Sequence, residues 1–390
     1  MNILCLTEYY PHKKNLYAGV AVQSLCHALT SFANVDIVNF FPLFPTFKKW
    51  SVSYLIRKDA PYSENIQGLS ILRPGYWNIP KIGKLFAPEL FVRNFLKNRA
   101  LQINNYDLIH ANWVFRAGYV GNLLSCQLHI PLIITCHGSD IHIDLHKRGL
   151  TGRLSNEALV GCDHVITVSK ELKECVQQAG ISQEKITIIP NGVDRNRFYP
   201  QIKIEARKKL QLPVEKFIFA YIGNFFHIKG PDILLQAVKH FQSINNDFLV
   251  LLIGQGSMRA EMTHFIQESK LESMIKFIPP QVHSDIPRWL AASDALVLPS
   301  RNEGCPMIVL ESLASGRPVI GTRVGAVPEL ISTDTVGKIL PPENSDALAQ
   351  GMKWAMDQKW VPETISDRVK EWGWENRARQ VCDLLGKKII

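Results

Sequence analysis

The sequence predicts an α/β protein built from two doubly wound parallel sheets, and three observations support this. The chain has 390 residues, more than one hydrophobic core of ordinary size can hold. In both halves, short apolar runs alternate with amphipathic runs, a pattern typical of parallel sheets with helices on both faces. A turn-rich connector at 190–200 separates the two series. We therefore expect one domain over residues 1–195 and another over 196–371, facing an interdomain cleft where doubly wound sheets bind ligands.

The apolar runs place the expected elements along the chain. In the first half, strands are expected at 2–6, 35–40, 70–73, 107–111, 131–136, 164–168 and 186–189. A helix is expected to open near Gly19, where apolar residues recur at helical spacing: Val22, Leu25, Cys26, Leu29 and Phe32. In the second half, strands are expected at 217–222, 248–253, 275–278, 295–299 and 318–321, with helices near 231–242, 258–270 and 307–315.

The composition is that of a globular protein, with 46% hydrophobic and 20% charged residues. No stretch approaches the ~18 apolar residues of a membrane-spanning helix, and the N-terminus does not resemble a secretory signal. The eight cysteines form neither a Cys-x-x-Cys pair nor a metal-ligand spacing. We therefore expect a cytoplasmic location and no bound metal.

The net charge of +9 is unevenly distributed. Residues 43–100 hold ten Lys or Arg against three acids, interleaved with aromatic residues. Two readings remain open: a solvated basic face with core aromatics, or a patch that meets anionic lipid head groups or a polyanionic acceptor. No nucleic-acid-binding signature accompanies the charge, so a nucleic-acid partner is not expected.

A first candidate site follows the strand expected at 217–222. The strand ends at Gly223, and a helix opens at Gly230 with a proline and an acid in its first turn. Lys229 is therefore expected at the carboxyl edge of the sheet, beside the unpaired amides of a helix N-terminus. A cation next to such amides is typical of a phosphate site, although a solvated lysine in an ordinary loop would give the same pattern.

A second candidate site spans residues 300–311. Glu303 is expected in the loop after a strand, and Glu311 about a turn and a half into the following helix. Gly304 would let a phosphate or sugar approach the amides of residues 305–308, and carboxylates suit sugar hydroxyls because they accept charge-assisted hydrogen bonds. The alternatives are a helix-capping acid for Glu303 and a structural helix glutamate for Glu311.

Both stretches resemble the retaining glycosyltransferases of family 4, which have the GT-B architecture of two Rossmann-like domains. Glu303 and Glu311 have the family's spacing of seven intervening residues, and 316–319 and 325–329 match the Gly-x-Pro-Val strand and Gly-x-x-Pro-Glu turn that follow it. Further matching motifs lie at Gly19, at 137–140, at 168–170, at 190–194, at 229–230 and at 254–256. The resemblance covers nearly the whole chain. It also implies that the final helix, at about 372–390, packs back on the N-terminal domain.

The resemblance implies a role for each matching residue of the C-terminal domain. Glu311 would hold the ribose hydroxyls, Glu303 the hydroxyls of the transferred sugar, and Lys229 the diphosphate. Val282 would lie near the base. The loop and first helical turn would contact the sugar and phosphates through their amides: Gly304, Cys305, Pro306, Met307 and Ile308. Asn224 replaces an arginine that is common in the family, so Lys229 would carry more of the interaction with the diphosphate.

In the N-terminal domain, the resemblance places His137 near the transferred sugar as a catalytic residue with Lys229 and Glu303. Gly19 would offer backbone amides to the β-phosphate, although the chain has one glycine there where many members have two. Asp140 is expected on the acceptor side. The rest of the acceptor site is not predicted.

The implied reaction moves a sugar from a nucleotide diphosphate sugar, with uridine diphosphate (UDP) as the expected carrier, to a glycan or lipid-linked acceptor. The resemblance implies that transfer proceeds with retention and without a cofactor. No metal is expected either, because the chain contains no Asp-x-Asp motif. Surface polysaccharide or glycolipid assembly at the inner face of a membrane is the expected setting. The alternatives are a non-catalytic sugar-binding protein of the same fold and a sugar-nucleotide epimerase. A nicotinamide enzyme is not expected, because no Gly-x-Gly-x-x-Gly follows a strand.

Overall fold

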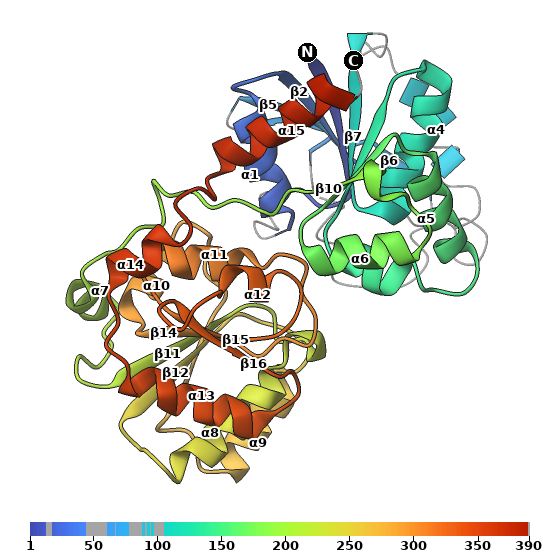
Figure 1. The fold of residues 1–390 in the computed structure, drawn as a ribbon. Coiled ribbons are helices and arrows are strands. Elements are labelled where there is room, and N and C mark those ends of the chain that lie inside the picture. The colour runs from blue at the N-terminus through green and yellow to red at the C-terminus, as the bar shows by residue number, and fades with distance from the viewer. Residues whose placement is uncertain are drawn as a thin grey trace. The chain divides into compact units, whose positions relative to one another are not determined.

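The computed structural model describes residues 1–12, 18–43, 61–66, 68–77, 88–89, 92–93, 95–96 and 105–388 (Figure 1). The chain forms two compact units. Unit 1 comprises Met1–Pro190 together with Trp374–Ile390, and unit 2 comprises Asn191–Gly373. The structure thus divides the chain slightly before the expected boundary at 195, and it assigns the last helix to unit 1.

Unit 1 is built on an eight-stranded sheet with the order β10-β9-β8-β7-β1-β2-β5-β4. The pairs are parallel except for β4 with β5. The strands are β1 (Asn2–Thr7), β2 (Asn34–Asn39), β4 (Ser63–Ile66), β5 (Leu69–Leu72), β7 (Leu108–Asn112), β8 (Leu132–Cys136), β9 (His164–Thr167) and β10 (Ile186–Ile188). A separate pair joins β3 (Phe41–Leu43) to β6 (Gly75–Trp77).

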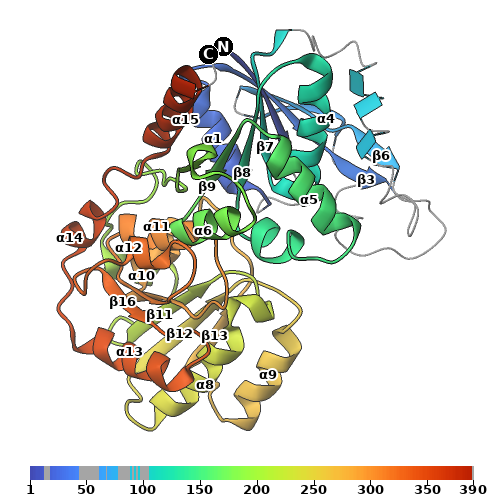
Figure 2. The same cartoon turned by 45° about the vertical axis from the view of Figure 1, so that its right-hand side comes forward.

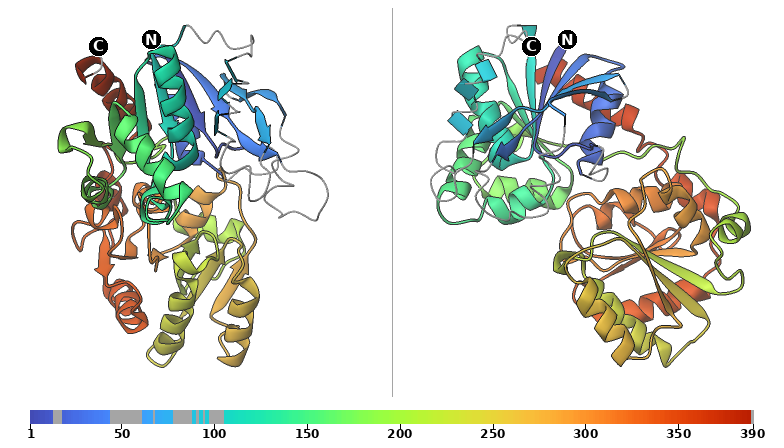
Figure 3. Two further views of the ribbon diagram at one scale, coloured as in Figure 1. Left: turned by 90° about the vertical axis from the view of Figure 1, so that its right-hand side faces the viewer. Right: turned by 180° about the vertical axis from the view of Figure 1, so that it is seen from behind.

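Helices cover both faces of this sheet (Figure 2). The α-helices of unit 1 whose full bounds lie among the described residues are α1 (Val20–Leu29), α4 (Tyr119–Leu128), α5 (Leu150–Gly161), α6 (Lys170–Gln178) and α15 (Trp374–Lys388). Shorter turns lie at η2 (Val114–Gly118), η3 (Asp140–Asp144) and η4 (Gln183–Lys185). The C-terminal helix α15 lies beside α1 (Figure 3). Its residues Ala378, Val381 and Leu384 are buried in the core to which α1 also contributes.

Unit 2 has a six-stranded sheet of parallel pairs, with the order β13-β12-β11-β14-β15-β16. Its strands are β11 (Phe217–Ile222), β12 (Phe248–Ile253), β13 (Ile275–Ile278), β14 (Ala295–Leu298), β15 (Val319–Thr322) and β16 (Gly337–Leu340). Its helices are α7 (Lys203–Lys209), η5 (His227–Lys229), α8 (Pro231–Gln242), α9 (Arg259–Glu268), α10 (Ile286–Ala292), α11 (Met307–Ala314), α12 (Val327–Leu330), α13 (Ser345–Asp357) and α14 (Pro362–Asp367).

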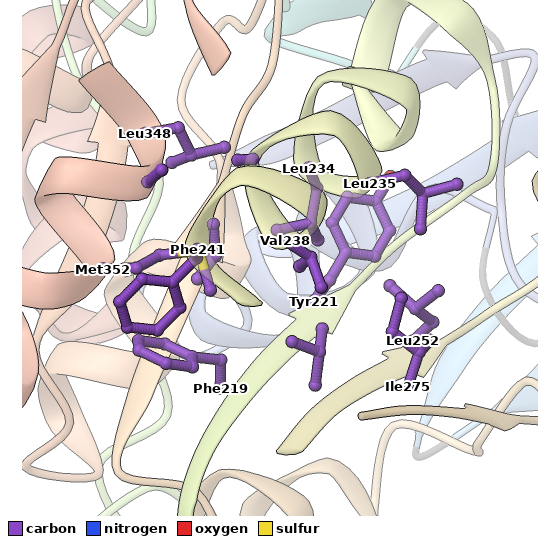
Figure 4. Close-up of a cluster of buried hydrophobic side chains, with 14 of the residues drawn as sticks. Phe219, Tyr221, Leu234, Leu235, Val238, Phe241, Leu252, Ile275, Leu348 and Met352 are labelled. Atoms are coloured by element: carbon purple, nitrogen blue, oxygen red, sulfur yellow. The ribbon is translucent and has the colours of Figure 1, made fainter. Parts of the chain in front are cut away.

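The larger core of unit 2 lies between its sheet and the helices α8, α9 and α13. Figure 4 shows how aromatic and aliphatic side chains of β11 and α8 interlock there, with Phe219 facing Phe241. A second core under the opposite face includes residues of α7 and α10. Buried helices on both faces explain why the central strands of this sheet are continuous apolar runs.

The expected strands all occur, within a few residues of their expected limits. Elements with a weaker apolar signal were not predicted, among them the half-exposed edge strand β4, the short edge strand β16 and the helix α13. Phe32 was expected in the first helix, but α1 ends at Leu29 and Phe32 is exposed beyond it.

The expectation for residues 43–100 lies largely outside the described residues. Within the part that is described, Arg73 is buried, with its guanidinium 2.7 Å from Glu64 and 3.2 Å from the carbonyl oxygen of Pro11. This arginine therefore belongs to the interior and not to a solvated basic face.

Candidate functional site

The strand order of unit 2 reverses at β11, which lies between β12 and β14. Open parallel sheets bind ligands beyond the carboxyl ends of their strands at such a reversal. The two loops at this point are residues 223–230, after β11, and residues 299–306, after β14. They contain the lysine and the first glutamate that the sequence singles out.

Arg301 joins the two loops. Its guanidinium donates two hydrogen bonds to the carboxylate of Asp232, at 2.8 and 2.7 Å, and a third to the carbonyl oxygen of His227 at 2.6 Å. Its amide donates to the carbonyl oxygen of Ile228 at 2.9 Å. Burial works to raise the pKa of Asp232, but the hydrogen bonds and charge of Arg301 outweigh it and lower that pKa. The two loops are thus held as one surface.

Gly230 lets the first loop pass against the second. It has φ 64° at the junction of η5 and α8, and a β-carbon there would overlap the carbonyl oxygen of Pro299. A side chain at this position would therefore meet both backbone strain and a backbone clash. The close approach brings the end of η5 next to the strand end that precedes Glu303.

Lys229 and Glu303 form an ion pair at this meeting point. The Nζ of Lys229 donates to Oε2 of Glu303 at 2.7 Å, and the hydroxyl of Ser300 donates to Oε1 at 2.7 Å. The Glu303 side chain is 8% exposed, whereas that of Lys229 is 32% exposed. Both oxygens of a nearly buried carboxylate therefore have partners, and the lysine retains access to a ligand. Glu303 does not cap α11, whose N-cap residue is Pro306 with no side-chain hydrogen bond.

The backbone between Glu303 and α11 is held from two sides. The amide of Ala326 donates to the carbonyl oxygen of Gly304 at 2.8 Å, and the side-chain amide of Asn191 donates to that of Cys305 at 2.8 Å. Cys305 itself is buried. Met307 and Ile308 open α11, and the first amides of a helix have no partner within it. The segment 304–308 thus presents helix-terminal amides on a fixed backbone.

Glu311 is buried one turn further along α11, with 4% of its surface exposed. Its Oε1 lies 2.6 Å from Nε2 of His283, and Nδ1 of His283 lies 3.1 Å from Nη1 of Arg197. Neither His283 nor Arg197 was predicted. The sequence signal was weak, since His283 only follows Val282, the residue expected near the base.

The remaining predicted residues of unit 2 lie at the surface. Asn224 is exposed, and its carbonyl oxygen accepts from the hydroxyl of Tyr221 at 2.8 Å. Val282 is 37% exposed, directly before His283. Both positions leave the side chain accessible to a ligand, and their roles remain predictions.

The strand order of unit 1 reverses at β1 and β7, and the residues after β7 and β8 form a second polar cluster. His137 follows β8, with its Nε2 3.0 Å from Oδ1 of Asn112 and its ring 4.4 Å from that of Trp113. An amide oxygen accepts, so Nε2 carries the proton and Nδ1 has a lone pair for a hydroxyl group.

Burial lowers the pKa of His137 to about 3, with a smaller contribution from the charge of His110. Burial alone lowers the pKa of His110 to about 4. Both imidazoles are therefore neutral at neutral pH. His137 can exchange hydrogen bonds with a sugar, but it does not supply a positive charge.

Asp140 was expected on the acceptor side, which stays a prediction, and the structure shows what its carboxylate contacts. Its carboxylate is buried and accepts hydrogen bonds from the amides of His137, Gly138, Ile141 and Val114, at 2.8 to 3.3 Å. Burial raises its pKa to about 6 although these amides work to lower it. Asp140 thus fixes the backbone that presents His137.

Gly19 opens α1 with φ 73°, and a β-carbon there would overlap the carbonyl oxygen of Tyr9. The position therefore requires glycine on steric grounds. Its predicted contact with a phosphate stays a prediction.

Metal-binding and membrane-spanning features are both missing from the part of the chain that the structure describes. It contains no group of three or more His, Cys, Asp and Glu side chains placed to hold a metal ion. No helix among the described residues combines the length and apolar character of a membrane span.

Comparisons of the sequence with known proteins match both units. Residues 19–197 match the model of Glycosyltransferase Family 4, and residues 202–372 match that of glycosyl transferases group 1. The "Putative teichuronic acid biosynthesis glycosyltransferase TuaC" of Bacillus subtilis is 27% identical over 373 residues, which cover 94% of this chain and 92% of that protein. A D-inositol 3-phosphate glycosyltransferase of Nocardioides is 24% identical over 76% of this chain and 70% of its own length.

Solved structures share the whole architecture. Sucrose-phosphate synthase from Thermosynechococcus elongatus superposes with a TM-score of 0.77 at 22% identity, covering 99% of each chain. Anabaena Alr3699/HepE in complex with UDP gives 0.75 at 21% identity, covering 99% of this chain and 100% of that one. With two doubly wound units and these structural neighbours, the protein has the GT-B fold. It belongs to the group 1 glycosyl transferases of family 4 and is a glycosyltransferase.

Proposed function

We propose that this glycosyltransferase uses a nucleotide diphosphate sugar, with UDP as the carrier, and transfers the sugar to a glycan or lipid-linked acceptor. The observation that carries the proposal is the group at the strand-order reversal of unit 2. There, Lys229 and Glu303 are paired beside the opening of α11, and Glu311 is buried one turn further on. A cation, helix-terminal amides and two carboxylates match the phosphates and hydroxyls of such a donor.

In the proposed reaction, the bond between the anomeric carbon and the diphosphate oxygen breaks, and negative charge develops on the leaving diphosphate. Lys229 and the first amides of α11 would stabilise this charge because they are already oriented before the reaction. Asn224 carries no charge, so Lys229 supplies most of the stabilisation. Glu303 keeps the ammonium group in place and accepts hydrogen bonds from the sugar hydroxyls.

We further propose that transfer retains the anomeric configuration and needs no metal. The acceptor proton would pass to the leaving phosphate oxygen, so no protein nucleophile is required. The absence of an Asp-x-Asp motif, the usual metal-bridging acidic pair, supports the metal-free route. Activity in excess EDTA tests this part, and the anomeric coupling constant of the product, read by NMR, tests retention.

The acceptor belongs, in our proposal, to surface polysaccharide or glycolipid assembly. The names of relatives support this class, since TuaC is named for teichuronic acid biosynthesis and the Nocardioides enzyme for D-inositol 3-phosphate. UDP as carrier draws support from the structural neighbour HepE, which was solved in complex with UDP. We extend the proposal to a peripheral position on the inner, anionic face of a membrane.

A thermal-shift titration with UDP and UDP-sugars tests the donor site. At about 100 times Kd, a ligand adds about 2.7 kcal/mol, which raises the melting temperature of a domain of this size by roughly 5 to 10 °C. Lys229→Ala and Glu311→Ala each remove a charge-assisted contact worth about 1.5–3 kcal/mol, so each should reduce the shift to about half or less.

Matched controls lie on the exposed surface of the same unit. Lys353 pairs with Asp357 on α13, and Glu268 pairs with His264 on α9, both in solvent. Lys353→Ala and Glu268→Ala should respond to UDP as the wild type does. The donor site is misassigned if no uridine nucleotide raises the wild-type melting temperature, or if Lys229→Ala and Glu311→Ala respond like their controls.

A further inference from the structure

The orientation of the Glu311 carboxylate is set by a neighbour that the family spacing does not include. Nε2 of His283 lies 2.6 Å from Oε1, and 5% of the glutamate side chain is exposed. Among the described residues, no hydrogen bond or ion pair other than this one engages the carboxylate. This single partner holds Oε1 in place and leaves Oε2 to a ligand.

The tautomer of His283 follows from its other partner. Nη1 of Arg197 lies 3.1 Å from Nδ1 of His283. A guanidinium only donates, so Nδ1 must accept and the ring proton must be on Nε2. Arg197 thus selects the tautomer of His283 that donates to Glu311.

The ring of His283 is also held in place by packing. It contacts Phe198, with ring centroids 5.4 Å apart, and Phe198 is buried. Arg197 lies 3.8 Å from Asp194, and the amides of Arg197 and Phe198 both donate to the carbonyl oxygen of Asp194. The segment from Asp194 to Phe198 therefore supports the imidazole by a hydrogen bond and a ring contact.

We infer that His283, with its tautomer set by Arg197, is a positioning residue that aims Glu311 at the 2′- and 3′-hydroxyls of the nucleotide ribose. The inference rests on the proposed function and deepens it. It makes the Arg197–His283–Glu311 chain the determinant that selects a ribonucleotide donor with both hydroxyls over one that lacks them. His283 acts through Glu311 and has no contact with the reacting atoms.

The test compares UDP with 2′,3′-dideoxy-UDP by calorimetric titration of the full chain. Oriented charge-assisted hydrogen bonds to the hydroxyls should make wild-type binding of UDP at least about tenfold tighter than that of the dideoxy compound. In His283→Ala this ratio of the two Kd values should fall to within about threefold, because UDP loses affinity and the dideoxy compound does not. General damage to the fold would weaken both ligands alike and leave the ratio unchanged.

Two further variants and a control sharpen the result. His283→Gln keeps an amide donor near Nε2 and should retain a larger ratio than His283→Ala. The Arg197 side chain is 40% exposed, so Arg197→Ala should have little effect on folding. It should lower the ratio of the two Kd values, because His283 can then adopt its other tautomer. His264→Ala removes a histidine that pairs with Glu268 in solvent, and should keep the wild-type ratio.

The inference is overturned if His283→Ala retains the wild-type ratio, or if His283→Gln is no better than His283→Ala. It is also overturned if the wild type binds both compounds equally, because Glu311 then makes no hydrogen bond to the ribose hydroxyls that contributes to affinity. Failure of the proposed function looks different: the wild type would bind neither compound.

Discussion

The two glutamates of unit 2 differ in their partners, and this difference sets what each can do. Glu303 shares its charge with the ammonium of Lys229 and accepts from Ser300. Glu311 receives one hydrogen bond, from the imidazole of His283, and has no lysine or arginine as a partner among the described residues. A carboxylate paired with an ammonium group suits a site that also receives phosphates, whereas one with a free oxygen suits hydroxyl donors.

The sequence predicts these glutamates and Lys229, but not the contacts of Glu311 with His283 and of His283 with Arg197. The glutamates' spacing of eight positions places one in the loop and one on the helix, which follows from local structure. Lys229 is 74 positions from Glu303, and Arg197 is 86 from His283. Such pairs depend on which strands are neighbours and on close approaches such as that of Gly230, so helix and strand periodicity does not reveal them.

His137 should remain neutral throughout the working pH range of the enzyme. Its pKa is lowered to about 3, and that of His110 to about 4, because burial disfavours the charged ring. NMR of protein labelled at histidine Cε1 should show both rings with constant shifts from pH 8 to 5, assigned through His137→Gln and His110→Gln. Free histidine in the same buffer, with a pKa of about 6.5, serves as the titrating reference. A midpoint near 6.5 for His137 would contradict the prediction.

The lowered pKa values of His137 and His110 also make the stability of the fold depend on pH. A histidine that the fold keeps neutral contributes its full stabilisation when the pH is above its pKa in the unfolded chain, about 6.5. This stabilisation is lost as the pH falls toward its pKa in the folded state. Asp140 works in the opposite direction, because its raised pKa favours the protonated form as the pH falls through about 6. The two effects partly offset each other between pH 4 and 6.

At the scale of elements, the strand ends position both clusters. The central strands were predictable because burial on both faces makes them continuous apolar runs. β4 and β16 were not, since a four-residue edge strand with half-exposed positions resembles a loop in sequence. The two polar clusters lie where the strand order of each sheet reverses. This order follows from which strands pair, and the sequence alone does not give the strand pairing.

The helix α15 completes the core of unit 1 from the far end of the chain. Val381 is 1% exposed and packs in the cluster that includes β1 and α1. Val381→Ala should lower the free energy of unfolding of unit 1 by about 1–2 kcal/mol through lost burial and a small cavity. Differential scanning calorimetry of the full chain should show this as a lower melting temperature.

Val160 offers a matched control in the same unit, since it is 59% exposed on α5. Val160→Ala should leave the transition of unit 1 within about 0.5 kcal/mol of the wild type. If Val381→Ala has as small an effect as this control, α15 does not contribute to the core as described.

At the scale of the whole molecule, the net charge of +9 makes the proposed membrane position testable. Basic residues near an anionic surface contribute about 1 kcal/mol each, and salt screens them. The protein should co-float with anionic liposomes at low salt and dissociate from them at high salt. It should not bind zwitterionic vesicles at either salt concentration. Failure to co-float at low salt would remove the membrane from the proposal.

Asn191 and Arg197 mark where an isolated donor domain would have to begin. The family match starts at residue 202, but the contact to the carbonyl oxygen of Cys305 comes from Asn191, and the contact to His283 from Arg197. A fragment cut at the family boundary would keep every strand of unit 2 and both glutamates. It would nevertheless lose the supports of Cys305 and His283, so the minimal donor-binding fragment is about ten residues longer than sequence matching implies.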